Sequence, residues 1–428
     1  MNEGLERIAL RAKTEPGCRF TALAHHLSED FLRDTWHRLN RRGAAGVDGV
    51  RMANYEESLD EHIRDLVAGL KRHYYHAPDV RRVYIPKAGN PEKLRPLGIP
   101  TVEDRLLQAG VARILSAIYE ADFLDCSYGF RPGRRAHDAL AVIRREVILG
   151  RANWVVEADI RGYFDAIGHE WMLRMLELRI GDPWILRLIE KWLKAGIFES
   201  GQVITPERGT PQGGPLSPVL ANVYLHYALD LWFERVVRPR SQDSVTLVRF
   251  ADDFVILCRN EQDARAIAAA LPRRLGKFGL SLAEEKTHVV PFGRVHWWRG
   301  EHRGHYFDFL GFRHHIGTNR KGRMSVVRIP SPKSVRRFLA ETKKWLWEHM
   351  HDRPEEQQRT LAAKVLGFYQ YFSVWQAGPK LRAVRQEVLK YWKWTLGRRS
   401  QRAKLSWADL QMKTWFTLPM PKLVHREV

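Results

Sequence analysis

The sequence predicts an α+β protein in which a mixed helix-and-strand part is followed by a basic helical part. Apolar and polar residues alternate in 153–160, and 245–258 consists of two apolar runs joined by a tight acidic turn; both patterns are typical of β-strands. Beyond about residue 325 the chain is rich in tryptophan, since nine of its fifteen tryptophans lie between Trp297 and Trp415. Helical spacing of apolar residues marks several segments between the strands, namely 169–180, 183–196 and 219–237.

The charge of the chain indicates a polyanionic partner. Seventy lysines and arginines face 49 acids over 428 residues, which gives a formal net charge of +21 at pH 7. Nucleic acid is the simplest such partner. An anionic membrane is the competing partner, but no apolar run approaches the roughly 18 residues of a membrane span. A hydrophobic fraction of 44% excludes disorder of the whole chain.

The cysteines and the first residues predict the compartment. Cys18, Cys126 and Cys258 are scattered and odd in number, which argues against a disulfide framework and a cysteine zinc site. The start, MNEGLERIALRAKTEPG, is charged and has no apolar core of a secretory signal. We therefore expect a cytoplasmic protein without a membrane partner.

The elements of the first 150 residues follow from periodicity and turn residues. Residues 1–42 predict short helices, in LERIALRAK, FTALAHHL and DFLRDTWHRLNRR. GAAGVDGV (43–50) carries three glycines and predicts a loop. A strand, a Gly-Asn-Pro turn and a second extended segment are expected over 81–100. Helices are expected at 55–70, 102–122 and 136–149.

The middle of the chain predicts a strand at 153–160 and a β-hairpin at 245–258. The loop 207–218 precedes the apolar helix 219–237, and a further helix at 264–279 ends at a glycine. A soft boundary falls near 322–332, where TNRKGR and IPSPKS supply turn residues, and helices are expected from about 325 onward. His314 and His315 are expected to be exposed or to face RNA.

Three carboxylates stand at the ends of these predicted strands: Asp159, Asp252 and Asp253. Carboxylates beside buried strands are costly unless cations compensate them. If the strand 153–160 lies beside the hairpin, Asp159 and Asp252 face each other, and one or two Mg²⁺ ions would relieve their repulsion. The alternative is that Asp252 and Asp253 only form a hairpin turn, because aspartate favours turns.

Two further segments have the composition of ligand sites. GTPQGGPLSPVLAN (209–222) places glycines and prolines before a helix, where backbone can approach a ligand and Gln212 could bond a base or sugar. Around the expected turn, Lys87, Lys93 and Arg95 suit a triphosphate. The alternatives are an ordinary helix-start loop and a solvated basic face.

Together these motifs resemble a known family. ADIRGYFDAI, GTPQGGPLSPVLAN, RFADDFVILC, GLSLAEEKT and FLGF occur in this order and resemble the palm of reverse transcriptases. IPKAGNPEKLRPLGIPTVEDRLLQ and YGFRPGRRAHDAL resemble the fingers motifs of that family. The chain is most similar to reverse transcriptase/maturase proteins of bacterial group II introns, over nearly its whole length. This resemblance implies a right-hand polymerase fold, with fingers and an antiparallel palm sheet followed by a helical thumb/maturase domain.

The resemblance also implies roles for single residues. Asp159 and Asp252 would bind two Mg²⁺ ions, for which Mn²⁺ could substitute, with the Ile160 carbonyl as a further ligand and Asp253 as the third acid. Phe250 stands where tyrosine is commoner, so the ring stays and the hydroxyl is lost. Phe164 would be the gate against a ribose 2′-hydroxyl. Lys93, Arg95 and Gln212 would contact the nucleotide and its triphosphate, and Lys286 would donate a proton to pyrophosphate. The primer grip would comprise Phe309, Leu310 and Gly311.

The resemblance further implies the domains and partners. Residues 1–80 are expected to form an N-terminal extension and the start of the fingers, and 81–322 the fingers and palm. Residues 323–395 are expected to form the thumb/maturase domain, and 396–428 a basic extension with a DNA-binding role. Intron RNA, an RNA template with a DNA primer, target DNA and dNTPs are the expected partners. Association with the nucleoid is expected on DNA. A homodimer is left open, and no appended HNH endonuclease is expected.

Several alternatives stay open. A host-adopted reverse transcriptase, in phage defence or CRISPR adaptation, would carry the same motifs, and so would a maturase that acts only in splicing. Phe164 argues against an RNA-dependent RNA polymerase. Trp345, Trp375 and Trp392 either form the core of a helix bundle or contact RNA.

Overall fold

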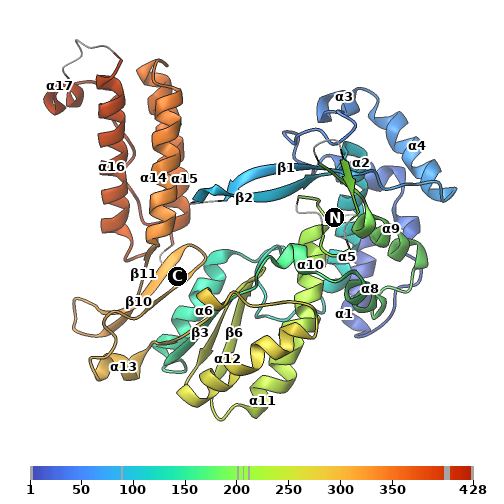
Figure 1. Ribbon diagram of the computed structural model, residues 1–428, viewed down its shortest axis with the longest axis horizontal. Coiled ribbons are helices and arrows are strands. Elements are labelled where there is room, and N and C mark those ends of the chain that lie inside the picture. Colours follow the sequence, from blue (N-terminus) through green and yellow to red (C-terminus); the bar gives the residue numbers. More distant parts are fainter. Residues whose placement is uncertain are drawn as a thin grey trace.

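The computed structural model describes residues 3–87, 90–199, 202–205, 207–210, 213–399 and 405–425. Figure 1 shows N-terminal helices on one side, a central sheet below and long C-terminal helices on the other side. A long hairpin projects from the N-terminal side toward those helices. We call these parts the fingers, the palm and the helical region. The arrangement confirms the predicted α+β class and has the layout expected of a right hand, with fingers, palm and a helical region.

The fingers combine helices with a four-stranded sheet in the order β2-β1-β4-β5. The helices are α1 Glu3–Thr14, α2 Glu29–Trp36, α3 Met52–Glu57, α4 Leu59–Lys71, α5 Val102–Tyr119, α8 His169–Glu177 and α9 Pro183–Lys194. The strands are β1 Val80–Lys87, β2 Asn90–Ile99, β4 Ile197–Glu199 and β5 Gln202–Ile204. The antiparallel pair β1–β2 is the projecting hairpin, as the sequence predicted.

One expected helix of the fingers is wrong. In FTALAHHL only Ala24–His26 forms a 3₁₀ turn, η1. The backbone N–H groups of Leu23 and Ala24 donate to the Asp182 carboxylate, at 2.6 and 2.9 Å. Phe20 forms a β-bridge with Ile180 in the same place. These tertiary contacts use the backbone groups that a helix would need, so they override the local periodicity.

The palm is an antiparallel sheet in the order β6-β7-β3-β8. Its strands are β3 Trp154–Asp159, β6 Val245–Phe250, β7 Asp253–Cys258 and β8 His288–Pro291. Further helices of this part are α6 Ala136–Ile148, α7 Tyr163–Ala166, α12 Glu261–Gly276, η4 Glu284–Lys286 and α13 Arg294–Trp298. The strand at 153–160 and the hairpin at 245–258 are therefore confirmed as neighbours.

The apolar helix predicted at 219–237 is not a regular α-helix. It begins as α10 Ser217–Leu225, continues through two π-helical segments and ends as α11 Arg238–Arg240. The π-helical segments are η2 His226–Asp230 and η3 Phe233–Val237. π-Helical turns are rare and often accompany functional sites.

A three-stranded sheet joins the palm to the helical region. Its order is β11-β10-β9, with β9 Tyr306–Phe309, β10 Phe312–Thr318 and β11 Met324–Pro330. The segment after residue 324 is thus a strand, not the expected helix, until Pro330. The limit at 322–323 falls between two paired strands, and the domain limits stay a prediction. His314 is fully buried and stacks on Phe307, so its expected exposure is wrong.

The helical region consists of α14 Pro332–Glu348, α15 Pro354–Phe372 and α16 Gly378–Gly397, followed by the short α17 Trp407–Gln411. The C-terminal segment folds back along these helices. Leu410, Phe416 and Leu418 are buried in the same core, and Phe416 stacks on Trp392 at 4.7 Å. Residues 405–425 are therefore an integral part of the bundle.

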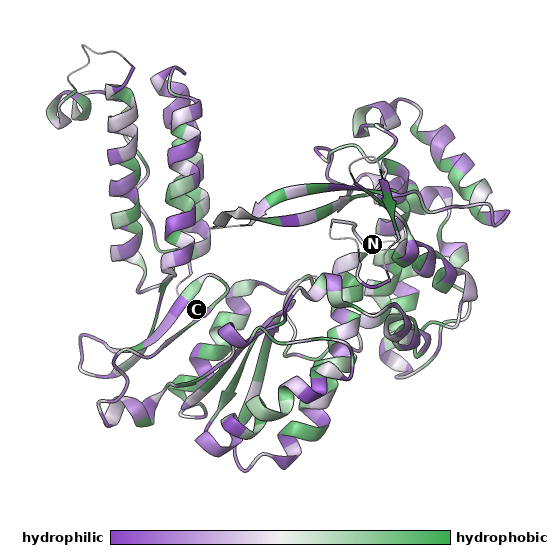
Figure 2. Cartoon of the chain, in the orientation of Figure 1, coloured by the Kyte–Doolittle hydropathy of each residue, from purple (hydrophilic) through white to green (hydrophobic). Residues whose placement is uncertain are grey.

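Two hydrophobic cores hold the molecule together. One lies under the fingers and one face of the palm sheet, and the other joins the opposite face to the helical region. In Figure 2 the palm strands are largely hydrophobic, whereas the long C-terminal helices alternate between hydrophobic and hydrophilic faces. Among the described residues, none of the helices combines the length and the apolar character needed to cross a bilayer.

Candidate active site

The three predicted carboxylates meet at one end of the palm sheet. Asp159 ends β3, Asp253 begins β7, and the antiparallel register pairs these two residues directly. Asp252 lies in the turn between β6 and β7, next to Ala251, whose φ of +56° is left-handed. The sequence placed Asp252 opposite Asp159; the structure pairs Asp253 with Asp159 because the turn contains both Ala251 and Asp252.

Burial and mutual repulsion disfavour the ionised form of these acids. The pKa of Asp252 is raised by burial and by the charge of Asp159, while Arg95 and Lys286 oppose the rise. Burial and the neighbouring acids raise the pKa of Asp253 to about 7. Nearby cationic charge would stabilise the ionised form of these carboxylates.

Lys286 supplies one such charge. Its ammonium group, on η4, contacts the Asp159 carboxylate. Burial lowers the pKa of Lys286, but the hydrogen bond and charge of Asp159 outweigh that effect and raise it. Arg95, an exposed residue of β2, is close enough to stabilise ionised Asp252. Arg95, a predicted triphosphate contact, and Lys286, the predicted proton donor, therefore both lie at the acidic centre.

Asp253 also holds the predicted primer grip. The Leu310 backbone N–H donates to Asp253 Oδ2 at 3.3 Å, and Tyr371 of α15 donates to the Leu310 carbonyl at 2.9 Å. Leu310 and Gly311 both have left-handed φ, of +52° and +77°. Phe309 is buried. The turn FLGF is thus fixed between the acidic centre and the helical region.

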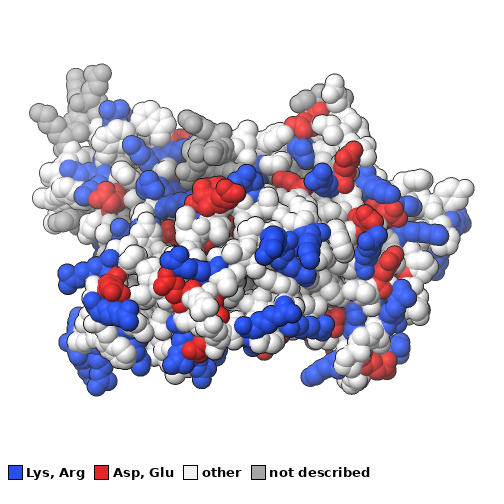
Figure 3. Space-filling view, turned by 60° about the horizontal axis from the view of Figure 1, so that its bottom comes forward, with Lys and Arg blue, Asp and Glu red and all other residues white. Residues whose placement is uncertain are grey.

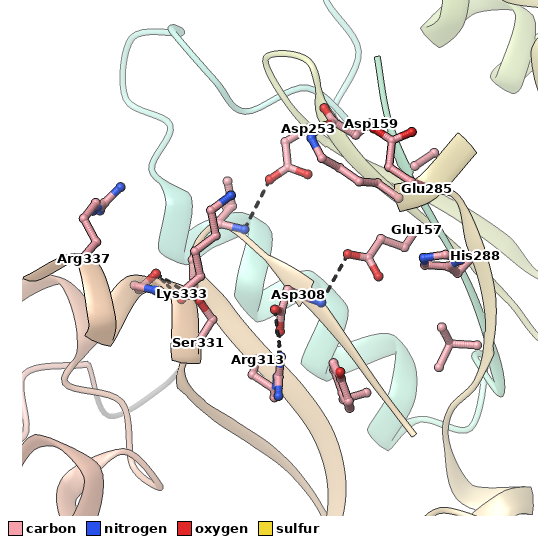
Figure 4. A pocket seen from close by; sticks show the side chains of 17 residues that line it. Glu157, Asp159, Asp253, Glu285, His288, Asp308, Arg313, Ser331, Lys333 and Arg337 are labelled. Atoms are coloured by element: carbon pink, nitrogen blue, oxygen red, sulfur yellow. Dashed lines mark hydrogen bonds and ion pairs between the residues drawn. The ribbon is translucent and has the colours of Figure 1, made fainter. Parts of the chain in front are cut away.

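A cavity of about 730 Å³ opens beside Asp159 and Asp253, between the palm and the helical region. Figure 4 shows Glu157, Asp159 and Asp253 on one side and Lys333 and Arg337 on the other. Burial raises the pKa of Glu157 to about 7, and the Asp308 N–H donates to Glu157 at 3.3 Å. The cavity therefore has an acidic wall and a basic wall.

Phe164 lies on the short helix α7, half-buried, with its ring 5.5 Å from that of Tyr163. The Thr210 N–H donates to the Phe164 carbonyl at 2.9 Å. A Cβ at Gly209 would lie 3.1 Å from that carbonyl and from the Asp165 Cα. Gly209 therefore allows the loop to pack directly against the predicted gate.

The same loop reaches the fingers. A Cβ at Gly213 would lie 2.4 Å from the Gly98 carbonyl, and one at Gly214 would lie 2.4 Å from Gln108 Oε1. The loop before α10 thus bridges the gate and the fingers. Gln212 and the side chain of Lys93, both predicted nucleotide contacts, lie outside the described residues.

Ile160 continues β3 by one residue and forms a β-bridge with Leu282. The backbone bonds of this bridge use the Asp159 carbonyl and the Arg161 N–H, at 2.8 Å each. Because carbonyls alternate along an extended strand, the Ile160 carbonyl is directed to the other edge, toward the acidic turn.

The donor set fits a hard divalent cation. Mg²⁺ is commonly bound through one or two carboxylates together with waters and substrate phosphates. Asp159, Asp252 and the Ile160 carbonyl provide such a partial set, and the Lys286 ammonium already compensates Asp159. In the described part of the chain, no group of three or more His, Cys, Asp or Glu side chains is arranged to hold a metal ion by itself.

Sequence reasoning missed several groups at this site: Glu157, Asp308, Arg313, Lys333, Arg337 and Tyr371. Glu157 could have been found, because it shares a face of the strand with Asp159, two residues later. Lys333 and Arg337 are one helical turn apart, a spacing that the sequence contains. Their approach to the acids depends on the sheet β9–β11, which the sequence did not predict.

Comparison with known proteins agrees with this geometry. Residues 85–314 match the family described as reverse transcriptase (RNA-dependent DNA polymerase). Group II intron-encoded protein LtrA of Lactococcus lactis subsp. cremoris is 42% identical over 223 residues, which cover 52% of this chain and 37% of LtrA. Protein YkfC of Escherichia coli (strain K12) is 31% identical over 382 residues, covering 81% of this chain and 97% of YkfC. An uncharacterized 91 kDa protein in the cob intron of Schizosaccharomyces pombe is 32% identical over 54% of this chain and 28% of its own length.

Proposed function

The chain belongs to the reverse transcriptase family, and from this premise we propose that it copies RNA into DNA at the acidic centre of the palm. The observation that carries the proposal is the convergence of Asp159, Asp252 and Asp253 with Lys286 at the end of two paired strands. The substrates are an RNA template, a DNA primer and dNTPs.

The residues of the centre divide the work of phosphoryl transfer. Asp159, Asp252 and the Ile160 carbonyl would hold two Mg²⁺ ions, or Mn²⁺ in their place. Such ions would supply activation of the primer 3′-hydroxyl and neutralisation of charge on pyrophosphate. Lys286 carries a proton for pyrophosphate, and Asp253 fixes the primer grip through Leu310. Positioning and electrostatics supply most of the acceleration.

The nucleotide lies between the palm and the projecting hairpin. Phe164 excludes a ribose 2′-hydroxyl, which favours dNTPs over rNTPs. Arg95, with Lys93 and Gln212, binds the triphosphate and the base or sugar. The closeness of Arg95 to Asp252 supports this arrangement, because both groups would act on the same triphosphate.

We further propose that the protein acts as a maturase, binding the RNA of a group II intron and promoting its splicing and target-primed retrohoming. The similarity to LtrA supports this role, although the chain spans only 37% of LtrA. A net charge of +21 favours a structured polyanion. Figure 3 shows lysine and arginine side chains in several groups over one face of the molecule. The segment 396–428 is proposed to contact target DNA.

Primer extension on an RNA template with dNTPs and Mg²⁺ tests the polymerase. Wild type is compared with Asp252→Ala, and Asp243→Ala is the matched control, because Asp243 forms a surface ion pair with Arg259 at 3.3 Å. We expect extension by wild type and the control only. No extension by folded, RNA-binding wild type, or full extension by Asp252→Ala, would refute the proposal.

A binding measurement tests the maturase role. The RNA that surrounds the gene is titrated with the protein, and an equal mass of bulk transfer RNA is the competitor. Binding of the surrounding RNA at least about tenfold tighter than tRNA, a difference of about 1.4 kcal/mol, supports an intron partner. Equal binding of the two RNAs favours a host-adopted reverse transcriptase.

A further inference from the structure

The palm contains a buried arginine directly beneath the acidic turn. Arg249 and Asp230 have no exposed side-chain surface and form an ion pair at 2.5 Å. A guanidinium has five N–H donors, and all five of Arg249 are used. At 2.5–3.1 Å they reach both oxygens of Asp230, Asn222 Oδ1, Ser127 Oγ and the Ala251 carbonyl. Such a side chain is held in one orientation.

One of these bonds fixes the conformation of the acidic turn. Arg249 Nη1 donates to the carbonyl of Ala251 at 3.0 Å, and Ala251 is the left-handed residue that precedes Asp252. The turn is also packed from the other side, since a Cβ at Gly129 would lie 2.5 Å from the Ala251 nitrogen. A non-glycine residue in this conformation is strained and persists only when its surroundings impose it.

The partners of Arg249 come from separate sequence motifs. Ser127 belongs to the segment before YGFRPG, and Asn222 ends GTPQGGPLSPVLAN. Asn222 also donates to the Gly129 carbonyl at 2.8 Å, which closes the network. The guanidinium therefore links two of the motifs to the acidic turn itself.

The π-helical segment explains how one helix supplies two partners. Asn222 and Asp230 are eight residues apart, which corresponds to about 80° around an ideal α-helix. The segment His226–Asp230 is π-helical, and its wider turns reduce that angle. Both side chains can then reach the same guanidinium.

We propose that the Arg249–Asp230 ion pair is a positioning device that holds the Ala251 carbonyl and thereby sets the direction of the Asp252 carboxylate. The inference rests on the proposed polymerase function and adds to it the groups that hold the acidic turn. Arg249 touches neither nucleotide nor primer; it acts through the turn. Altering it should change turnover and metal binding more than the affinity for dNTP, because the other proposed triphosphate contact, Arg95, lies outside the network.

The test compares Arg249→Lys with Arg179→Lys. Lysine at 249 keeps the charge beside Asp230 but cannot span the four partners. Arg179 is the matched control, because it is a buried arginine whose ion pair with Asp122, at 3.0 Å, lies in the fingers. Three quantities are measured: kcat and KM for dNTP in primer extension, the melting temperature, and Mn²⁺ binding. Mn²⁺ binding is followed by EPR on the complex with template, dideoxy-terminated primer and dNTP, where no turnover occurs.

We expect Arg249→Lys to lower both kcat and Mn²⁺ affinity by about tenfold, with a smaller change in KM for dNTP. Arg179→Lys should lower the melting temperature only. Folded Arg249→Lys with wild-type kcat and Mn²⁺ affinity would overturn the proposal, and so would the same losses in Arg179→Lys. If wild type does not extend primers, the polymerase proposal fails, and the Mn²⁺ measurement still decides the role of the ion pair.

Ser127→Ala covers the case in which Arg249→Lys does not fold. It removes one hydrogen bond of 2.8 Å to the guanidinium and leaves the ion pair in place. We expect kcat and Mn²⁺ affinity to fall by about fivefold, the equivalent of one ordinary hydrogen bond. Unchanged kcat and Mn²⁺ affinity in Ser127→Ala would overturn the proposal in that case.

Discussion

The palm and the helical region place their polar and aromatic groups in opposite ways. In the palm, charged groups are buried and paired, as in Arg249 with Asp230, or converge on one point, as the three acids do. In the helical region, cations and several of the tryptophans lie on the surface of a packed bundle. Trp347 and Trp375 are 53% and 69% exposed. Lys343 and Arg398 lie over the ring of Trp394, at 5.8 and 4.4 Å.

The difference corresponds to the two proposed tasks. Phosphoryl transfer requires fixed positions, which a buried and fully bonded network provides. Binding a large RNA requires many exposed cations and aromatic faces, each of modest effect. We therefore expect single substitutions in the palm to change turnover strongly, and those on the helical surface to change RNA affinity weakly.

The largest effect is expected at the acidic centre. Asp159→Asn removes a charge that is proposed to hold the cations, while keeping the shape of the side chain. Extension should fall by at least about 10⁴-fold, which is about 5 kcal/mol of transition-state stabilisation. RNA affinity, measured by filter binding, should stay within twofold of wild type. A comparable loss of RNA affinity would show that the two regions do not act separately.

A second prediction concerns the core of the helical region. Trp392 is fully buried and donates to Gln357 at 2.8 Å. Trp392→Ala should lower the free energy of unfolding by about 4 kcal/mol, because it leaves a large cavity. Chemical denaturation followed by circular dichroism measures this value. A loss below about 1 kcal/mol would contradict the assignment of Trp392 to the core.

A third prediction concerns the sheet that joins the two regions. Burial, with the charges of Arg328 and His315, lowers the pKa of His314 to about 3. The unfolded chain therefore binds a proton more readily than the folded chain, and stability falls as the pH drops below about 6.5. The contribution of His314 to the loss of stability at pH 5, relative to pH 8, should be about 2 kcal/mol.

His314→Phe keeps the stacking on Phe307, whose ring lies 4.6 Å away at 5°, and should remove this loss. His351→Gln, at an exposed position, is the control and should retain the loss. The measurement is the difference in unfolding free energy between pH 5 and pH 8 for wild type and for each variant. An unchanged difference in His314→Phe would refute the role of His314.

The smallest effect is expected on the helical surface. Trp375→Ala should raise the RNA dissociation constant by about fivefold, or about 1 kcal/mol, through loss of one stacking face. Its stability should change by less than about 0.5 kcal/mol, because the side chain is exposed. Trp298→Ala is the control, since Trp298 is 67% exposed but belongs to α13. Equal weakening by both variants would contradict a specific RNA contact.

The two regions also differ in how much their sequences predict. The alternation in 153–160 and the two apolar runs of 245–258 predicted the strands. The pairing of the first strand with the hairpin was only a condition of the argument, and the structure supplies it. Local periodicity could not predict that Asp253, not Asp252, pairs with Asp159, since this depends on how many residues the turn contains.

Long-range contacts explain the other differences. The bond from Tyr371 to Leu310 and the approach of Lys333 to the acids join segments far apart in the chain. In the helical region, composition indicated RNA contacts but could not separate the buried Trp392 from the exposed Trp375. Sequence spacing shows which residues share a face of a helix, but which face is buried depends on where the neighbouring helices pack.

The most direct test of the account measures turnover and RNA affinity on the same preparations of Asp252→Ala and Trp375→Ala. The template–primer is titrated from below its dissociation constant to saturation, and the extension rate is recorded at each point. We expect Asp252→Ala to bind as wild type does and to show no extension at saturation. Trp375→Ala should need more template–primer but reach the wild-type rate. Equal changes of rate and affinity in both variants would contradict a separation between palm chemistry and helical RNA binding.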